Sequence, residues 1–248
     1  MGASMTRSIF IGDVHGCADE LVDLLAAVKH TASDRVFFVG DLVARGPDSR
    51  RVLAIYRSVG ARGVLGNHED RLLEARAARR AGQPGPHLGP SHAQLMQELD
   101  DADWALLEAL PLTLDVPEHR VRIVHAGVVP GVPLERQERT HLLKMRALEA
   151  DGTPTAKWRP HSWAEHYFEE PHVIFGHNAV SGLQLHPHAT GLDTGCVYGG
   201  KLTCLVLREQ QLVPSVGERA QHLFSVTARR RYVDFGPRYE DNGKAGLE

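Results

Sequence analysis

The sequence predicts an α/β fold built as a single domain, with strands and helices in separate layers. Short apolar runs rich in β-branched and aromatic residues indicate buried strands. Between the early runs, apolar residues recur every three or four positions, which is the spacing of the buried face of a helix. Five of the apolar runs are followed by an Asp, Asn or His residue close to a glycine. Because a sheet must bury its apolar faces, the alternation of strands and helices favours stacked layers.

The predicted strands are, in chain order, 8–11, 35–39, 62–65, 120–124, 172–175 and 202–207. Clear helical spacing is found at 18–29, 47–59, 67–80 and 92–109, with weaker patterns at 134–148 and 162–169. The segment 81–90 (AGQPGPHLGP) is dense in glycine and proline, so we expect an irregular loop there. From about residue 190 onward the pattern is typical of β-hairpins.

The domain is expected to span 5–216, followed by a C-terminal extension over 217–248. A chain of 248 residues is short enough for one hydrophobic core. The extension contains the basic cluster Arg229, Arg230 and Arg231, for which a solvated tail is the simpler interpretation.

The overall composition excludes several classes of protein. The formal net charge of −3 does not require nucleic acid or an anionic membrane as a partner, so any attraction for phosphate must be local. No apolar run has the length of a membrane span, and the first residues, MGASMTRS, lack the apolar centre of a signal peptide. The three cysteines include no CxxC pair, which argues against a disulfide framework and a thiolate zinc site. We therefore expect a cytoplasmic protein without a membrane partner.

Polar residues at the ends of five predicted strands are the strongest functional signal. They lie in Gly12-Asp13-Val14-His15-Gly16, Gly40-Asp41, Gly66-Asn67-His68-Glu69, His125-Ala126-Gly127 and Gly176-His177. Ligands of open α/β sheets bind at the carboxyl ends of the strands, where the loops diverge and leave a crevice. Taken singly, such an Asp is commonly a helix cap and such a His a core residue. The five segments together predict one shared site.

The types of these side chains predict a site for metal ions. Two Asp, one Asn and three His residues offer oxygen and imidazole nitrogen without sulfur, the set preferred by borderline divalent cations. The residues are Asp13, His15, Asp41, Asn67, His125 and His177. A single carboxylate, that of Asp41, can bridge two ions. We therefore expect a dinuclear centre.

The motifs GDVHG, GDLVARG, GNHE, HAG and a late GH, in this order, resemble those of the calcineurin-like metallophosphoesterases. The resemblance implies a four-layer αββα sandwich with two divalent metal ions. Mn²⁺ is expected, with Co²⁺, Fe²⁺, Zn²⁺ and Mg²⁺ as alternatives. Asp13 and His15 would hold the first ion, Asn67, His125 and His177 the second, and Asp41 would bridge them. Arg45 matches the phosphate-binding arginine of the family, and Arg146 is the candidate for a second one.

Within this family, GDLVARGP at 40–47, FGHNAVSG at 175–182 and LDTGCVYGG at 192–200 resemble the symmetrical bis(5′-nucleosyl)-tetraphosphatases. The resemblance implies a nucleotide substrate, diadenosine tetraphosphate, cleaved to two ADP by a metal-bridging hydroxide, with His68 as general acid. Alternatives are a serine/threonine/tyrosine protein phosphatase and removal of a nucleoside-polyphosphate cap from an RNA 5′ end, which the Arg229–Arg231 cluster permits. A non-catalytic metal-binding protein is a third, and the complete ligand set argues against it.

Two features depart from the pattern of the family. Protein phosphatases read GDxVDRG, where the second Asp orients the His of GNHE, but Ala44 occupies that position here. The missing carboxylate is consistent with an anhydride substrate, for which His68 need not be held as a strong proton donor. Moreover, only 51 residues separate His125 from His177, fewer than in the best-known tetraphosphatases.

Two other catalytic motifs are excluded. GCVYGGK at 195–201 resembles the start of a phosphate-binding P-loop, but Leu202 replaces the required Ser or Thr and the next segment is a predicted strand. The nucleophile motif GxSxG is absent from the chain.

Overall fold

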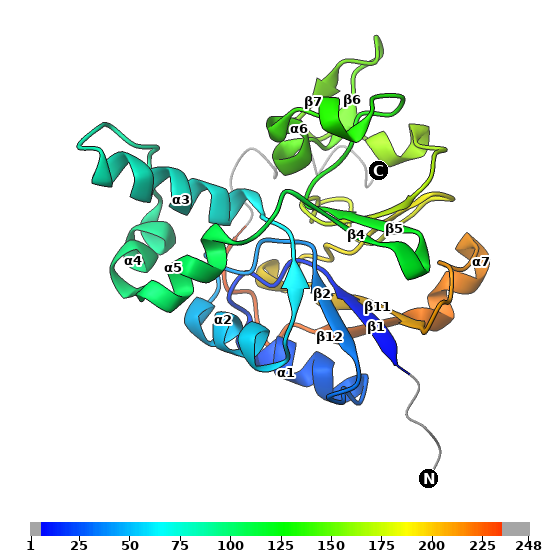
Figure 1. Ribbon diagram of the computed structural model, residues 1–248, viewed down its shortest axis with the longest axis horizontal. Helices are drawn as coiled ribbons and strands as arrows, with labels where there is room; N and C mark the ends of the chain where they lie inside the picture. The colour runs from blue at the N-terminus through cyan, green and yellow to red at the C-terminus, as the bar shows by residue number, and fades with distance from the viewer. Residues whose placement is uncertain (1–5, 235–248) are drawn as a thin grey trace.

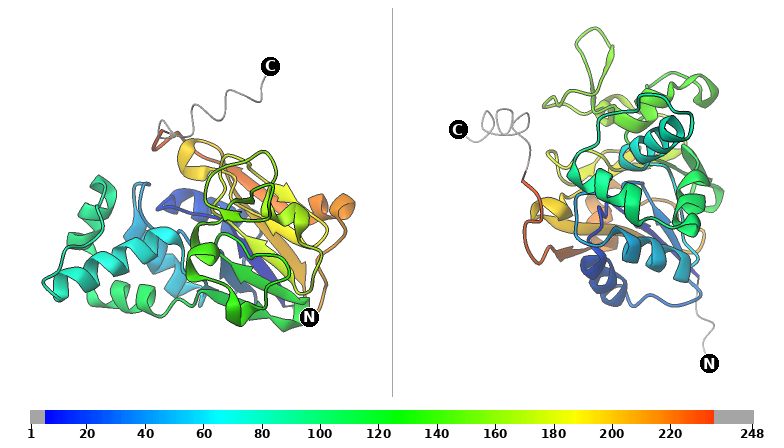
Figure 2. Two further views of the ribbon diagram at one scale, coloured as in Figure 1. Left: turned by 90° about the horizontal axis from the view of Figure 1, so that it is seen from above. Right: turned by 90° about the vertical axis from the view of Figure 1, so that its left-hand side faces the viewer.

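A computed structural model describes residues 6–234 of the protein. In this part of the chain, two five-stranded sheets and one two-stranded hairpin form. The two large sheets lie against each other at the centre of the molecule, and helices flank them (Figures 1 and 2). The predicted α/β sandwich is therefore confirmed.

The first sheet contains the early strands of the chain. Its order is β12 (Leu223–Thr227), β11 (Lys201–Arg208), β1 (Arg7–Ile11), β2 (Arg35–Phe38) and β3 (Arg62–Gly63). Strands β1, β2 and β3 are parallel, whereas β11 and β12 are added antiparallel on one side. The carboxyl ends of β1, β2 and β3 therefore meet at one edge of this sheet.

The second sheet also contains three adjacent parallel strands, but they lie at its centre. Its order is β4 (Thr113–Val116), β5 (Val121–Val124), β8 (His172–Phe175), β10 (Ala189–Gly191) and β9 (Gln184–Leu185). The three central strands β5, β8 and β10 are parallel, and both edge strands are antiparallel to their neighbours. All six predicted strands are present, two in this sheet and four in the first.

Alternation along the strands separates two sets of buried side chains. Phe10 of β1 points between the sheets, where its ring stacks on that of Phe37 at 5.1 Å. Its neighbours Ile9 and Ile11 point to the other face, into the core beneath the helices. Since successive side chains of a strand face opposite sides, strands buried on both faces are apolar throughout. This explains the continuous apolar runs of the sequence.

The outer layers differ in thickness. Helices α1 (Ala18–Ala27) and α2 (Ser49–Ser58) cover the first sheet, and α5 (Asp101–Glu108) packs beside α2. On the second sheet the cover consists of α6 (Arg139–Lys144) and a short 3₁₀ helix that contains the fully buried Trp163. Within the described residues, the 3₁₀ helices are η1 (Pro117–His119), η2 (Leu134–Arg136), η3 (Trp163–His166), η4 (Cys196–Tyr198) and η5 (Ala220–His222).

Three of the predicted helices differ from the structure. The segment 92–109 is divided into α4 (Pro90–Glu98) and α5, because Asp100 caps a new helix by accepting from the backbone N–H of Asp103 at 2.9 Å. The segment 134–148 is helical only over η2 and α6, since Ala147 and Leu148 form strand β6 and pair with β7 (Pro154–Thr155). The segment 162–169 contains only η3.

The described part of the C-terminal extension packs against the domain. After α7 (Val216–Arg219) and η5, β12 forms the edge of the first sheet. Arg229 makes ion pairs with Asp19 and Asp23 of α1, and its backbone N–H donates to Glu20. The Arg229 side chain is therefore neutralised within the molecule.

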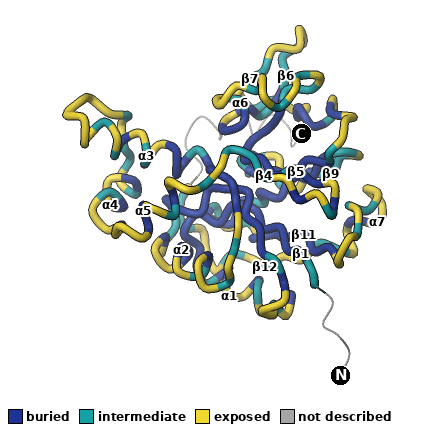
Figure 3. The backbone as a smooth tube through the Cα atoms, viewed as in Figure 1, coloured by how far each residue is buried: buried dark blue, intermediate teal, exposed yellow. Residues whose placement is uncertain are grey.

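Two groups of elements project beyond the sandwich (Figure 1). One consists of α3 (Asn67–Arg80) and α4, joined by the exposed loop that the sequence predicts at 81–90 (Figure 3). The other is the β6–β7 hairpin with α6. No helix of the described chain is long and apolar enough to cross a membrane.

Candidate metal centre

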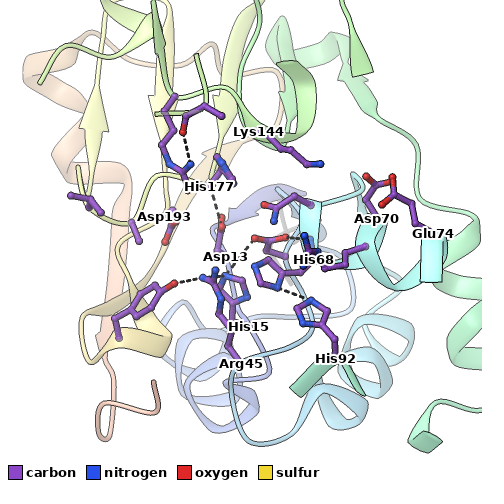
Figure 4. A pocket seen from close by; sticks show the side chains of 18 residues that line it. Asp13, His15, Arg45, His68, Asp70, Glu74, His92, Lys144, His177 and Asp193 are labelled. Atoms are coloured by element: carbon purple, nitrogen blue, oxygen red, sulfur yellow. Dashed lines mark hydrogen bonds and ion pairs between the residues drawn. The ribbon is translucent and has the colours of Figure 1, made fainter. Parts of the chain in front are cut away.

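The loops that follow five strands bring the predicted site residues together. Asp13 and His15 follow β1, Asp41 follows β2, and Asn67 and His68 begin α3 shortly after β3. From the second sheet, His125 follows β5 and His177 follows β8. The site therefore lies where the two sheets meet, at the carboxyl ends of their parallel strands (Figure 4).

Asp41 occupies the centre of this cluster. Its Oδ2 atom lies 3.4 Å from Nε2 of His15 and 3.4 Å from Nε2 of His125. Its Oδ1 atom accepts the backbone N–H of His68 at 3.0 Å. One carboxylate thus faces imidazole groups from both sheets.

Two groups of donor atoms share this carboxylate. In the first, single atoms of His15, Asp41 and His68 lie within 4.8 Å of one another, and in the second the same holds for Asp41, His125 and His177. The first group includes His68 where the resemblance implies Asp13. Asn67 adjoins the second group, with its Oδ1 atom 3.0 Å from Nε2 of His125.

Asp13 connects the two sheets on the other side of the cluster. Its Oδ2 atom accepts the backbone N–H of His177 at 3.0 Å. Its Oδ1 atom is buried and has no hydrogen-bond partner, and the same is true of Nε2 of His177. Buried polar atoms are nearly always paired, so two unpaired acceptors in one cluster fit a bound cation.

The backbone is strained where these side chains leave it. His15, Asp41 and His177 have positive φ angles of 49°, 49° and 68°. Such angles are uncommon for residues other than glycine and concentrate at functional sites. Ala44 and Arg45, in the next turn, have φ angles of 69° and 70°. The strand exits are therefore shaped to aim side chains at the cluster.

Two glycines of the motifs leave room for the carboxylates. A Cβ atom on Gly176 would lie 1.9 Å from Oδ1 of Asp13, and one on Gly66 would lie 2.3 Å from Oδ1 of Asp41. These are distances that real Cβ atoms do not adopt. The glycines are thus required by close packing against the site.

Burial and mutual repulsion set the charges of the site. Burial, together with the nearby carboxylates of Asp193 and Asp41, raises the pKa of Asp13 well above its ordinary value. Burial would also raise the pKa of Asp41, but the surrounding imidazoles outweigh it and lower that pKa. Burial lowers the pKa of His15 to about 3 and lowers the pKa of His177. These low pKa values keep the imidazoles of His15 and His177 neutral, each with a lone pair for a metal ion, whereas at His125 the opposing effect of burial is outweighed by the charge of Asp41, which raises the pKa.

Glu69 holds the backbone beside the donor cluster by hydrogen bonds, a role that the sequence did not reveal. Its buried carboxylate accepts the backbone N–H groups of Asp41 at 2.9 Å, of Val43 at 3.0 Å and of Gly66 at 3.0 Å. Burial and the charge of Asp41 raise the pKa of Glu69 to about 7. Glu69 therefore fixes the loop that carries Asp41. The E of the GNHE motif was its only signal.

Arg45 is placed between the cluster and Tyr198. Its Nη1 atom lies 3.4 Å from Nε2 of His15 and donates to the Tyr198 hydroxyl, and its guanidinium carbon is 5.3 Å from the centre of the tyrosine ring. Tyr198 lies within the segment 192–200, but the sequence gave no sign of this contact. The ring and the hydroxyl together orient the arginine at the edge of the donor cluster.

Arg146 lies between α6 and β6 and reaches the loop that carries His177. Its Nη1 atom donates to the carbonyl of Ala156 at 2.8 Å and its Nη2 atom to the carbonyl of His177 at 3.4 Å. Lys144 from the end of α6 lies near it along the same cavity wall. The predicted second arginine is thus next to the cluster, on the projecting β6–β7 side.

A cavity of about 760 Å³ lies between the two projecting groups of elements, and most of the predicted site residues line it. Asp193, which follows β10, is a further lining residue, and burial raises its pKa to about 6. It stands at another strand exit, in the sequence LDTG, but was not singled out. The wall formed by α3 and α4 includes His68, Glu74 and His92.

His68 has a histidine as its partner, a contact that the sequence did not indicate. Its Nδ1 atom lies 3.1 Å from Nε2 of His92, and the two rings stack with centres 4.9 Å apart. Because His92 comes from α4 and not from the motifs, no local pattern of the sequence indicated the contact. Burial lowers the pKa of His92 to about 4 and that of His68 well below its ordinary value.

This fold and this donor cluster define a class of enzyme. Residues 6–211 match the calcineurin-like phosphoesterase family, and the chain belongs to that family. Members of the family use a dinuclear centre of divalent metal ions, with which the shared position of Asp41 agrees. The family resemblance of the sequence motifs is confirmed.

Several relatives and one solved structure similar to this chain are described as tetraphosphatases. The chain is 32% identical to a symmetrical bis(5′-nucleosyl)-tetraphosphatase from Shewanella oneidensis, over 82% of this chain and 96% of the relative. It is 29% identical to an asymmetrical one, PrpE from Oceanobacillus iheyensis, over 84% and 91%. A crystal structure described as "a putative diadenosine tetraphosphatase" superposes with a TM-score of 0.75 at 34% identity, covering 92% of this chain and 96% of that one.

Proposed function

We propose that this protein is a metal-dependent hydrolase of dinucleoside polyphosphates, which cleaves diadenosine tetraphosphate to two ADP. The observation that carries the proposal is Asp41, whose carboxylate belongs to two donor groups at once. The similarity to tetraphosphatases along most of the chain supports the substrate class.

The proposed metal ligands are the predicted ones. Asp13 and His15 would hold one divalent cation, Asn67, His125 and His177 the other, and Asp41 would bridge the two. The unpaired Oδ1 of Asp13 and Nε2 of His177 support this assignment. When bound, such a pair of ions activates water and neutralises charge on the phosphate. Mn²⁺ is our first choice, and a set of oxygen and nitrogen donors also suits Co²⁺, Fe²⁺, Zn²⁺ or Mg²⁺.

The proposed role of the arginines is to bind phosphate. Arg45 adjoins His15 of the first donor group, and Arg146 adjoins His177 of the second, while Lys144 lines the same cavity. Guanidinium groups bind phosphate oxygens in pairs and stabilise the charge that spreads over the transferring phosphoryl group. Cations beside both donor groups fit a polyphosphate chain that extends in both directions from the bond attacked.

The size of the cavity supports an extended nucleotide substrate. Its volume of about 760 Å³ is in the upper half of the usual range for small-molecule sites, roughly 300–1,000 Å³. A side chain of a phosphoprotein would need much less space.

The decisive experiment identifies the bond that is cleaved. Diadenosine tetraphosphate, a phosphopeptide and capped RNA are incubated with the protein, with and without Mn²⁺, and the products are separated. We expect two ADP from the first substrate, and in ¹⁸O-labelled water a label on one ADP per turnover. ATP and AMP as products would refute the symmetrical assignment. Faster turnover of phosphopeptide or of capped RNA would refute dinucleoside polyphosphates as the substrate class.

We also propose that the protein is located in the cytoplasm, which cell fractionation tests.

A further inference from the structure

His68 lacks the carboxylate partner that the protein phosphatase motif would supply, because Ala44 occupies that position. The ring of His92 instead stacks on that of His68 at an interplanar angle of 18°, with Nε2 of His92 3.1 Å from Nδ1 of His68 (Figure 4). Both side chains are buried. The contact is therefore a hydrogen bond between two imidazoles, shielded from competing water.

We propose that His92 is a positioning residue, which fixes the ring and the tautomer of His68 in place of the missing carboxylate. The catalytic part of this inference rests on the proposed hydrolase function. The pairing itself does not, because it is a property of the folded protein alone.

The direction of this hydrogen bond decides which nitrogen of His68 serves the site. In the proposed direction, Nε2–H of His92 donates to Nδ1 of His68, which leaves the proton of the His68 ring on Nε2. That atom lies on the other side of the ring, and His68 lines the cavity with its ring 4.8 Å from that of His15. His68 can then donate a hydrogen bond from Nε2 toward the oxygen of a leaving group.

A neutral partner has a different effect from a carboxylate. A carboxylate stabilises a charged imidazolium, which is a strong general acid, whereas a neutral imidazole only orients the ring. Burial keeps His92 uncharged. Orientation alone suits a phosphate leaving group, whose last pKa is about 6, better than a basic alkoxide. A histidine partner in place of a carboxylate partner therefore favours phosphoanhydride substrates over phosphate esters.

The loop at 81–90 has a place in this inference. It returns the chain from α3 so that α4 begins beside α3 and His92 falls in its first turn. Arg71 of α3 holds the loop by donating to the carbonyl of His87 at 2.7 Å. Leu95 and Leu99 are buried on the same helix side and anchor it to the core. The position of His92 is thereby fixed by packing and not by the metal ligands.

The first test reads the tautomer of His68 in the metal-free, full-length protein by long-range ¹H–¹⁵N NMR correlations. We expect one neutral form with its proton on Nε2. His92→Phe keeps a stacked ring but removes the hydrogen bond, so both tautomers of His68 should appear. His92→Gln, whose amide N–H can donate to Nδ1, should restore the single form. His87→Phe, the same change at an exposed position of the loop, is the matched control. A single Nε2–H tautomer in His92→Phe would overturn the proposal.

The second test measures kcat and KM for diadenosine tetraphosphate and for phenyl phosphate, which has a basic leaving group. His92→Phe should lower kcat for phenyl phosphate at least about tenfold more than kcat for the anhydride, with little change in KM. His92→Gln should recover most of the loss. Equal losses for both substrates would show that His92 acts only on stability. If wild type hydrolyses neither substrate while the tautomer result holds, the proposed function fails and the pairing stands.

Discussion

Oε2 of Glu69 accepts the backbone N–H of Asp41 at 2.9 Å, so the residue at the centre of the donor cluster is held by its main chain as well as by its side chain. Glu69 reaches this position from the first turn of α3. Because the φ angle of Asp41 is 49°, its loop needs such support to remain in place.

The first prediction concerns this support. Glu69→Gln keeps one oxygen but turns the other acceptor into an N–H group, which would face a backbone donor. We expect Mn²⁺ affinity to fall about 10- to 100-fold, as is usual for residues that orient ligands. Isothermal titration calorimetry measures the affinity, with Glu108→Gln on the exposed end of α5 as the control. Unchanged affinity in Glu69→Gln would mean that the loop is rigid without it.

The second prediction concerns the bridge itself. Asp41→Asn should reduce bound metal from two ions to one or none and lower kcat more than about 100-fold, because a neutral amide cannot neutralise two cations. Metal content is measured after gel filtration by atomic emission. Asp115→Asn, at an exposed ion pair with Arg122, should keep both ions. Two retained ions and near-normal turnover in Asp41→Asn would refute the dinuclear assignment.

The third prediction uses a glycine. In Gly176→Ala the new methyl group must displace Asp13, since it would lie 1.9 Å from Oδ1. We expect destabilisation of about 1–3 kcal/mol and weaker metal binding, as for other overpacked sites. Gly217→Ala, whose Cβ would meet nothing within 4 Å, is the matched control for urea unfolding. Equal stability of the two variants would show that the Asp13 loop yields at no cost.

The fourth prediction returns to Ala44. Ala44→Asp should raise the ratio of phosphopeptide to diadenosine tetraphosphate turnover, because a carboxylate near His68 strengthens it as an acid. The rise should be larger in the His92→Phe background, where Nδ1 of His68 has lost its partner. Values of kcat/KM for both substrates at one pH and fixed Mn²⁺ provide the ratio. A constant ratio in both backgrounds would exclude leaving-group basicity as the reason for alanine at this position.

The fifth prediction concerns pH and a histidine away from the site. Burial, and then the charges of Arg219 and His188, lower the pKa of His172 to about 3, from an unfolded value of about 6.5. Between these values the unfolded chain binds more protons than the folded one, so stability is lost as pH falls. His172→Gln should reduce this loss, seen as a flatter dependence of the free energy of unfolding on pH from 6.5 to 4. Parallel curves for both proteins, in EDTA, would contradict the assigned shift.

The sequence predicted those features that depend on local pattern. Strand exits at Asp13, Asp41 and His125 were visible because apolar runs end there next to polar residues. Glu69 was within a recognised motif, yet its contacts with the Asp41 loop depend on how α3 sits against β2. His92 could not be foreseen at all, because its role depends on the packing of α4 against α3. The helix expected at 134–148 failed because pairing of β6 with β7 outweighed its weak periodicity.

The donor cluster joins the two sheets at one end of the apolar core that lies between them. Asp13, Asp41 and Asn67 belong to the first sheet, and His125 and His177 to the second. Hydrogen bonds near the cluster already cross this boundary, among them one from the His177 backbone N–H to Asp13 and one between the His125 ring and the carbonyl of Val39. Bound cations would therefore cross-link the two sheets at one end of the sandwich. A substitution in the core between the sheets that shifts one sheet relative to the other would move the two sets of ligands apart. Such a remote substitution would then reduce catalytic activity.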